Sequence, residues 1–143
     1  MANSEFNRPR LTVAAIVERE GRFLIVHEHD DVLNQPAGHV EFGESLIDAA
    51  VRECLEESAW LVQPCALLGV YASTRAAAHY VRVALICEAI ADTSAALDPD
   101  IVAAYWLTRD EILAHRCSPR SELTLRCIDD YLAGRRFPLA AIA

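Results

Sequence analysis

Three acidic side chains stand close together in one short segment of the chain. Glu53, Glu56 and Glu57 have the spacing i, i+3 and i+4, so a helix would place them on one face within about one turn. Like charges at this spacing repel, whereas a divalent cation between them would reverse the sign of that effect. Hard cations such as Mg²⁺ prefer oxygen ligands. The segment predicts a metal site, with a solvated acidic helix face as the competing interpretation.

A loop with two glycines precedes this acidic segment. Gly38 and Gly43 lie before Glu44, which stands nine residues ahead of Glu53. A hard-metal site beside such a loop suggests phosphate chemistry, because hydrolysis of a phosphoric anhydride needs charge neutralisation, a positioned water and an anionic leaving group. Arg52 offers an internal counter-charge, which could pair with Asp48 or with Glu56 at i−4 and i+4.

The elements that position these groups follow from the hydrophobic periodicity. Apolar, β-branched runs predict strands at 11–17, 23–27, 66–73, 80–90 and 101–107. Ser45 predicts a helix N-cap with Asp48 as its return partner, and the helix then carries an apolar stripe on one face. In the 80–90 strand, Arg82 should point away from the face that carries Val83 and Leu85.

Loops and further helices complete the expected order. Pro36 and Gly38 predict an irregular loop over 29–38. Thr108 and Glu111 form a capping-box pattern, Ser118-Pro119 should open a last helix, and Gly134 should end it. Because some strands follow one another without a helix between them, we expect a mixed sheet between helices, an α+β fold of the α/β/α sandwich kind. The 143 residues suit a single domain over 1–143.

Composition excludes several classes of function. The net charge is −8 and no Lys/Arg block is present, which argues against binding to nucleic-acid polymers or acidic membranes. Five cysteines without a CxxC pair are expected to be reduced and buried, in preference to a disulfide or zinc framework. His27 and His29 are expected to be structural or solvent-facing, and no histidine cluster has zinc-site spacing. Without an apolar membrane-spanning run, a soluble cytoplasmic protein is expected.

The acidic segment and its loop together resemble a known family signature. The residues from Gly38 to Glu44, followed by Arg52-Glu53-Cys54-Leu55-Glu56-Glu57, resemble the Nudix box, and every charged position matches in type and spacing. Ala59 stands where the family has glycine, and Trp60 and Cys54 replace aliphatic residues. If that glycine is a left-handed C-cap, alanine there destabilises the helix end by roughly 1–2 kcal/mol.

The likeness extends beyond the box to one bacterial Nudix subfamily. The segments 10–14, 34–39, 125–127 and 136–139 resemble phosphatases that act on nucleoside tri- and diphosphates and on hydroxymethylpyrimidine diphosphate, a thiamine precursor. The resemblance implies a Nudix fold and Mg²⁺-dependent hydrolysis, with Mn²⁺ as a possible substitute. A small-molecule substrate is implied, and the chain could be a monomer or a homodimer.

The resemblance also implies roles for the residues of the box. Glu53 and Glu57 are the principal metal ligands, the Gly38 carbonyl adds another, and Glu56 completes the expected ligand set. Glu56 or Glu57 could instead orient the attacking water. The family's equivalents of Arg52 and Glu44 help to hold the loop and helix together, so both are expected to orient the ligands.

Candidate substrate contacts are less specific. Arg82 could contact a phosphate or form a surface ion pair. Arg75 and His79 could touch a base or phosphate, or lie in a solvated loop, and His39 could face the phosphates. Tyr71 and Tyr80 could stack on a base or pack in the core or against the sheet. Asp98 and Asp100 could act as a catalytic base or metal ligand, or simply form a turn.

Three functions compete at this stage. The first is a Nudix phosphatase that releases a terminal phosphate from a nucleotide or pyrimidine diphosphate. The second is a house-cleaning pyrophosphohydrolase that acts on a damaged nucleotide or a dinucleoside polyphosphate. The third is a non-catalytic Nudix module that binds nucleotides, which the retained carboxylates disfavour.

Overall fold

The computed structural model describes residues 8–74 and 78–142. Its strands are β1 Arg10–Arg19, β2 Arg22–Glu28, β3 Val32–Asn34, β4 Ala37–His39, β5 Trp60–Ser73, β6 Tyr80–Asp92, β7 Ile101–Leu107, β8 Ser118–Pro119 and β9 Phe137–Pro138. Its helices are α1 Leu46–Ser58, α2 Arg109–Ala114, α3 Glu122–Leu132 and the short 3-10 helix η1 Leu139–Ala141. All five strands predicted from the sequence are therefore present.

Strand β1 lies at the centre of a mixed sheet. It pairs in parallel with β6 and antiparallel with β4, and near its end it pairs with β2. On one side the sheet continues from β6 to β5 and β9, and on the other from β2 to β3 and β8, while β7 also pairs with β2. This topology brings the ends of β2, β3 and β4 toward one edge of α1.

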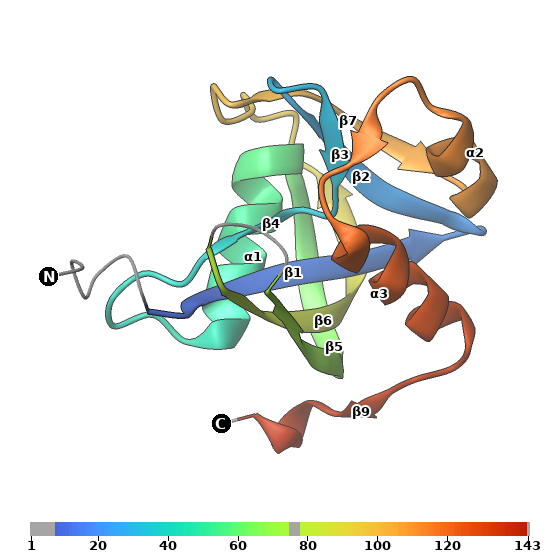
Figure 1. Cartoon of the computed structure of the whole chain (residues 1–143). Helices are drawn as coiled ribbons and strands as arrows, with labels where there is room; N and C mark the ends of the chain where they lie inside the picture. The colour runs from blue at the N-terminus through green and yellow to red at the C-terminus, as the bar shows by residue number, and fades with distance from the viewer. Residues whose placement is uncertain (1–7, 75–77, 143) are drawn as a thin grey trace, which may run out of the picture.

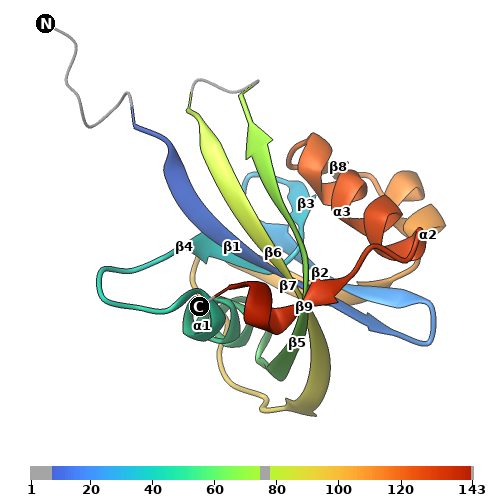
Figure 2. The same cartoon turned by 90° about the horizontal axis from the view of Figure 1, so that it is seen from below.

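The helices cover both faces of the sheet. Alternate residues of β1 separate two cores, because Val13, Ala15 and Val17 pack with Cys54 of α1, whereas Ile16 packs with residues of α2 and α3. Figures 1 and 2 show α1 on one side of the sheet and the α2–α3 pair on the other. The expected α/β/α sandwich is confirmed.

Helix caps follow the sequence signals at two of the three helices. Ser45 caps α1, where its hydroxyl oxygen accepts the Asp48 N–H at 3.0 Å, but the expected return bond from the Ser45 N–H to the Asp48 side chain is absent among the described residues. Thr108 and Glu111 form the expected reciprocal capping box of α2. The predicted start of the last helix was wrong. Ser118-Pro119 pairs in parallel with β3 instead, and Ser121 caps α3. A proline can begin an edge strand as readily as a helix, so the dipeptide was ambiguous.

The expected loop over 29–38 was also partly wrong. Residues Val32–Asn34 and Ala37–His39 form short strands on either side of Pro36. Strand β4 pairs with β1 in the register Val13 to Gly38, so Gly38 is part of the sheet edge. Short edge strands tolerate Pro and Gly better than central strands do, and the local composition therefore did not exclude them.

All five cysteines are free thiols, and four of them are buried, in agreement with the expectation of reduced cysteines. Cys65 is only partly buried. Among the residues that the structure describes, no helix is long and apolar enough to cross a membrane.

Candidate metal and phosphate site

A cleft of about 660 Å³ opens where α1 meets the ends of β2, β3 and β4. Glu53 and Glu57 project from α1 into this cleft, and Gly38, His39 and Arg82 line it from the sheet. Glu56 is not among the residues that line the cleft. The i, i+4 pair of the sequence analysis thus points inward, while the third carboxylate of the cluster lies outside.

Glu57 is the most perturbed carboxyl group of the cleft. Its Oε1 accepts the Ala37 N–H at 2.8 Å, and none of the described basic side chains forms a salt bridge with it. Burial is the main cause that raises the pKa of Glu57 to about 8; the Ala37 hydrogen bond opposes this rise, and the nearby Glu53, Glu28 and Asp98 carboxylates add to it. A nearby cation would therefore favour the charged form of Glu57.

Glu53 lies in the narrow space beside Gly38. Its side chain is only 13% exposed, and burial raises its pKa although Arg52 donates to its Oε1 at 2.9 Å. A Cβ atom built on Gly38 would lie 2.2 Å from the Glu53 Cδ atom. Gly38 is thus required for the position of the Glu53 carboxylate, because any larger residue would displace it.

These two carboxylates fit a hard divalent cation. Both supply oxygen donors, both have pKa values raised by burial, and the two stand one helical turn apart at one wall of the cleft. Among the described residues, no basic side chain compensates a buried negative charge on Glu57. A bound cation would offset the free-energy cost of burying that charge. The Gly38 backbone lies next to Glu53 and could contribute its carbonyl oxygen.

Arg52 binds the loop to the helix. Its Nε atom donates to Glu44 Oε2 at 2.6 Å and its second terminal nitrogen to Glu44 Oε1 at 2.9 Å, a two-point contact. The same nitrogen donates to the His39 carbonyl at 3.1 Å. The Arg52 hydrogen bonds, with help from the Glu41 N–H, lower the pKa of Glu44 to about 2. Arg52 also pairs with Glu56 at 3.2 Å, whereas no ion pair joins it to Asp48 in the described part of the chain.

Arg82 is buried at the floor of the cleft. It is 6% exposed, and its guanidinium donates to Gln35 Oε1 at 2.8 Å and Asn34 Oδ1 at 3.0 Å. Because these acceptors are uncharged, the alternative of a surface ion pair was wrong. The guanidinium also lies 3.8 Å from the Cys127 sulfur of α3, which confirms that Arg82 faces away from Val83 and Leu85.

The other candidate residues occupy different surroundings. His39 and Tyr80 line the cleft with their ring centroids 6.2 Å apart. Tyr71 is buried and donates to Asp130 at 2.8 Å, so its structural interpretation is supported. His79 is exposed, and Arg75 lies outside the described residues.

Two acidic positions lie close to the carboxylates of α1. The Asp98 N–H donates to the Glu56 carbonyl at 2.8 Å, and the Asp98 charge raises the pKa of both Glu53 and Glu57. Glu28, at the end of β2, lines the cleft and acts on Glu57 in the same way. Asp100 is exposed and donates its N–H toward Asp98 Oδ1 at 3.4 Å.

Comparison with known proteins identifies the family. The sequence matches the NUDIX domain over residues 8–126. Phosphatase NudJ of Escherichia coli strain K12 is 36% identical over 141 residues, which cover 94% of this chain and 91% of that protein. The chain belongs to the Nudix family.

Solved structures support the assignment of this Nudix hydrolase. A NUDIX hydrolase from Nitrosomonas europaea superposes with a TM-score of 0.90 at 40% identity, over 95% of this chain and 97% of that one. The NUDIX domain of Shewanella oneidensis NrtR, solved with ADP ribose, has a TM-score of 0.72 at 15% identity, over 94% and 93% of the chains. The second likeness shows the fold alone.

The Nudix box helix ends without the family's glycine. Ala59 has φ +64° and ψ 7°, the left-handed conformation, and its N–H donates to the Leu55 carbonyl at 2.9 Å. Trp60 packs edge-on against Trp106 with ring centroids 5.2 Å apart, and the Arg19 guanidinium lies over both rings. The departure at Ala59 thus places backbone strain at the helix exit, as expected, and leaves the carboxylates in position.

Sequence reasoning missed a cluster of three charged residues in the cleft of this Nudix hydrolase, Arg120, Glu28 and Asp30. Arg120 reaches from the segment after β8 and donates to Glu28 at 3.1 Å and to Asp30 at 3.3 Å. The sequence pattern indicates that Glu28 is a polar residue at the end of a strand. Its position near α1 depends on the packing of β2, which the local sequence does not predict. The sequence pattern predicts that Arg120 lies near the start of a helix. In the structure β8 pairs with β3, and Arg120, which directly follows β8, therefore lies at the cleft.

Proposed function

We propose that this Nudix hydrolase, a single domain over residues 1–143, cleaves phosphoric anhydride bonds with Mg²⁺, for which Mn²⁺ can substitute. The substrates are nucleoside tri- and diphosphates or hydroxymethylpyrimidine diphosphate, and the product is orthophosphate. One observation carries the proposal: Glu53 and Glu57 face the same cleft as partly buried carboxylates, and Glu57 has no protein cation beside it among the described residues. Hydrolysis of a phosphoric anhydride requires neutralisation of the phosphate charge, and a metal ion bound at this position would provide it.

Each residue of the box has a proposed part. Glu53, Glu57 and the Gly38 carbonyl would hold the metal, with Glu56 at the margin because its side chain is 47% exposed and pairs with Arg52 at 3.2 Å. When bound, Mg²⁺ neutralises charge on the phosphates. Glu56, Glu57 or Asp98 orients the attacking water as a general base. Arg52 and Glu44 act as positioning residues that keep the Gly38 loop against α1.

Arg82 is the proposed phosphate contact at the cleft floor. Its charge is buried and its hydrogen-bond acceptors are the neutral Asn34 and Gln35 side chains, so an anionic substrate would add favourable electrostatics. His39 and Tyr80 line the outer part of the cleft and are proposed to contact the substrate. Arg75 is proposed for the same role on the basis of sequence alone.

The likeness to phosphatase NudJ favours terminal phosphate release over the pyrophosphohydrolase alternative. That relative is called a phosphatase and matches 94% of this chain. A solved UDP-X diphosphatase shares the fold at 16% identity with a TM-score of 0.76, which carries no information on the substrate. The cytoplasmic location and the monomeric or homodimeric state stay predictions.

The decisive experiment measures products separately. Purified protein is incubated with Mg²⁺ and with nucleoside triphosphates, nucleoside diphosphates or hydroxymethylpyrimidine diphosphate, and orthophosphate and pyrophosphate are quantified in parallel. Orthophosphate from nucleoside diphosphates or the pyrimidine diphosphate supports the proposal. Pyrophosphate with a nucleoside monophosphate supports the pyrophosphohydrolase. Calorimetric nucleotide binding without any product after long incubation supports a non-catalytic module and contradicts hydrolysis.

A further inference from the structure

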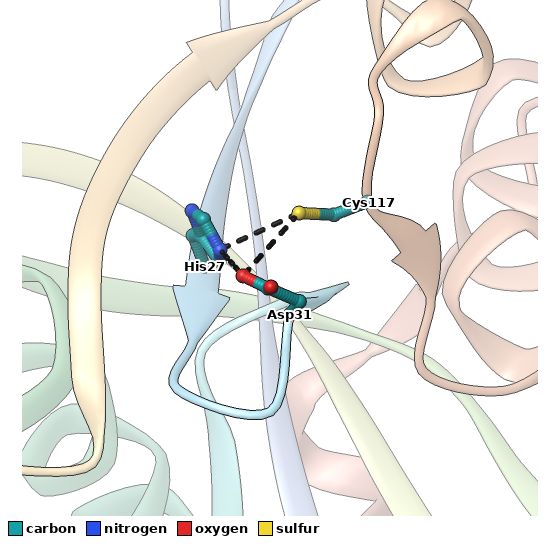
Figure 3. A group of neighbouring side chains, drawn as sticks. All are labelled: His27, Asp31 and Cys117. Carbon is teal, nitrogen blue, oxygen red and sulfur yellow. Dashed lines mark hydrogen bonds and ion pairs between the residues drawn. The ribbon is translucent and has the colours of Figure 1, made fainter.

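Three chemically distinct donors meet at a second place in the fold, away from the box carboxylates. His27 Nε2 lies 2.8 Å from Asp31 Oδ1 and 3.4 Å from Cys117 Sγ, and the sulfur lies 3.9 Å from the Asp31 oxygen. Figure 3 shows the three side chains pointing toward one another from β2, from the turn after it and from the segment before β8. No zinc-site spacing is evident in the sequence, because Cys117 is 90 positions from His27.

The three donor atoms of His27, Asp31 and Cys117 point toward one common position, which is not the geometry of a proton relay. A relay through His27 would place the carboxylate and the thiol at opposite ring nitrogens, but both lie at Nε2. The other nitrogen, Nδ1, lies 3.2 Å from the Tyr105 hydroxyl. In the tautomer whose Nδ1–H donates to the Tyr105 oxygen, this bond fixes the ring and the Nε2 lone pair is available to a metal. His27 and Cys117 are each 3% exposed, so the thiol is poorly placed to attack a substrate.

We propose that His27, Asp31 and Cys117 bind a tetrahedral transition-metal ion of the Zn²⁺ class, with water as the fourth ligand. Metal–ligand bonds of about 2.0–2.3 Å in a tetrahedron separate the donor atoms by roughly 3.3–3.6 Å. The observed separations of 2.8, 3.4 and 3.9 Å bracket this range, so small side-chain movements suffice. A thiolate and an imidazole select such an ion over Mg²⁺, which prefers oxygen ligands.

The neighbouring groups are compatible with binding. The Asp31 side chain is 60% exposed, which gives an ion a route from solvent to the buried sulfur and nitrogen. Arg116 lies 3.5 Å from Asp31 Oδ1, but its side chain is 69% exposed and free to turn into water. His115 Nδ1 accepts the Cys117 N–H at 3.0 Å and so orients the segment without joining the ligand set. Binding releases the Cys117 thiol proton to solvent, and His27 binds the ion through Nε2 with its ring proton on Nδ1.

A metal bound here would link two segments that form one wall of the cleft. Asp31 belongs to the turn between β2 and β3, and Cys117 immediately precedes β8, which pairs with β3 and leads to Arg120. Arg120 in turn contacts Glu28 in the cleft. The ion therefore joins two segments that otherwise meet through a short parallel strand pair, and it is expected to stabilise the fold.

The test uses the full chain, stripped of metal with a chelator and titrated with Co²⁺ in excess Mg²⁺. Co²⁺ accepts the same tetrahedral sites as Zn²⁺, and a thiolate ligand gives it a near-ultraviolet charge-transfer band that carboxylate ligands do not produce. The band should saturate at one Co²⁺ per chain, disappear when Zn²⁺ is added, and persist in Glu57→Gln. Zn²⁺ at saturating concentration should raise Tm by roughly 5 °C.

Matched variants separate this site from nonspecific binding. Cys117→Ser should abolish the band, whereas Cys65→Ser, which changes a partly buried thiol on β5, should leave it intact. Asp31→Asn changes an exposed side chain, so this variant should fold normally and bind Co²⁺ roughly tenfold or more weakly. If Cys117→Ser does not fold, the Co²⁺ affinity of Asp31→Asn tests the proposed site. Absence of a thiolate band at one equivalent, or a band unchanged in Cys117→Ser or Asp31→Asn, overturns the proposal. None of these readouts depends on phosphate hydrolysis, so the proposed function is tested separately.

Discussion

The Glu53 carboxylate occupies the space that a side chain on Gly38 would fill, with its Cδ atom 2.2 Å from the ideal Cβ position. We expect Gly38→Ala to fold, because the displaced group is the end of one flexible side chain. Glu53 must move, however, so Mg²⁺-dependent turnover should fall roughly tenfold or more, as when a ligand's support is removed. Circular dichroism, Tm and kcat/KM provide the measurements.

A double variant shows whether the loss acts through Glu53. Gly38→Ala combined with Glu53→Gln should be little worse than Glu53→Gln alone, because both changes remove the same carboxylate from its position. Additive losses would mean that Gly38 acts by another route.

Arg52 provides a second prediction, because its two-point contact with Glu44 needs a planar guanidinium. Arg52→Lys keeps the charge but cannot reproduce both bonds and the contact with the His39 carbonyl. We expect roughly a 10–100-fold loss of kcat/KM with the fold intact. The control is Arg126→Lys, which alters an exposed i, i+4 pair with Asp130. Equal activity in the two variants would contradict the positioning role of Arg52.

Stability of the metal-free protein should depend on Glu57. Its folded pKa of about 8 lies above the ordinary value of 4.5, so the folded state retains a proton that the unfolded state has lost. Stability should therefore fall as pH rises from 4.5 to 8, by at most about 1.4 kcal/mol per pH unit from this group. Denaturation with a chelator present should show this slope in the native protein and a smaller one in Glu57→Gln. Identical slopes would contradict the pKa assignment.

Ala59 offers a test of backbone strain. Glycine relieves a left-handed conformation that disfavours alanine by about 1–2 kcal/mol, against the loss of one buried methyl group at about 0.8 kcal/mol. Ala59→Gly should therefore raise the free energy of unfolding by up to about 1 kcal/mol. Ala133, the C-cap of α3, has φ −75°, so Ala133→Gly should not stabilise. A stabilising control or a destabilising Ala59→Gly would refute the strain argument.

The parts of this protein that were predictable depend on local sequence. The spacing of Glu53 and Glu57 defines a helix face, and Ser45 and Thr108 specify caps within four residues of themselves. The inward direction of Glu57 could not be separated from the outward direction of Glu56, because both belong to the charged side of the helix and only the packing of β3 and β4 distinguishes them.

Contacts distant in sequence were not predictable. Arg120 reaches Glu28 and Cys117 reaches His27 because β8 pairs with β3, and that pairing involves only two residue pairs. Neither segment carries a periodic signal, since β8 is two residues long. Arg82 is similar: the strand pattern predicted its face, but its partner Asn34 lies on β3 and its partner Gln35 lies in the link between β3 and β4.

The central claim, that Glu53 and Glu57 form the metal site of a hydrolase, is tested most directly by acid-to-amide substitution on α1. Glu53→Gln and Glu57→Gln should each reduce Mg²⁺-dependent kcat/KM roughly 100-fold or more, because each removes a charged ligand without changing side-chain size. The matched control, Asp48→Asn, changes an exposed carboxylate of the same helix outside the cleft and should retain activity. Turnover and Mg²⁺ dependence that are unchanged in both Glu53→Gln and Glu57→Gln would contradict the account.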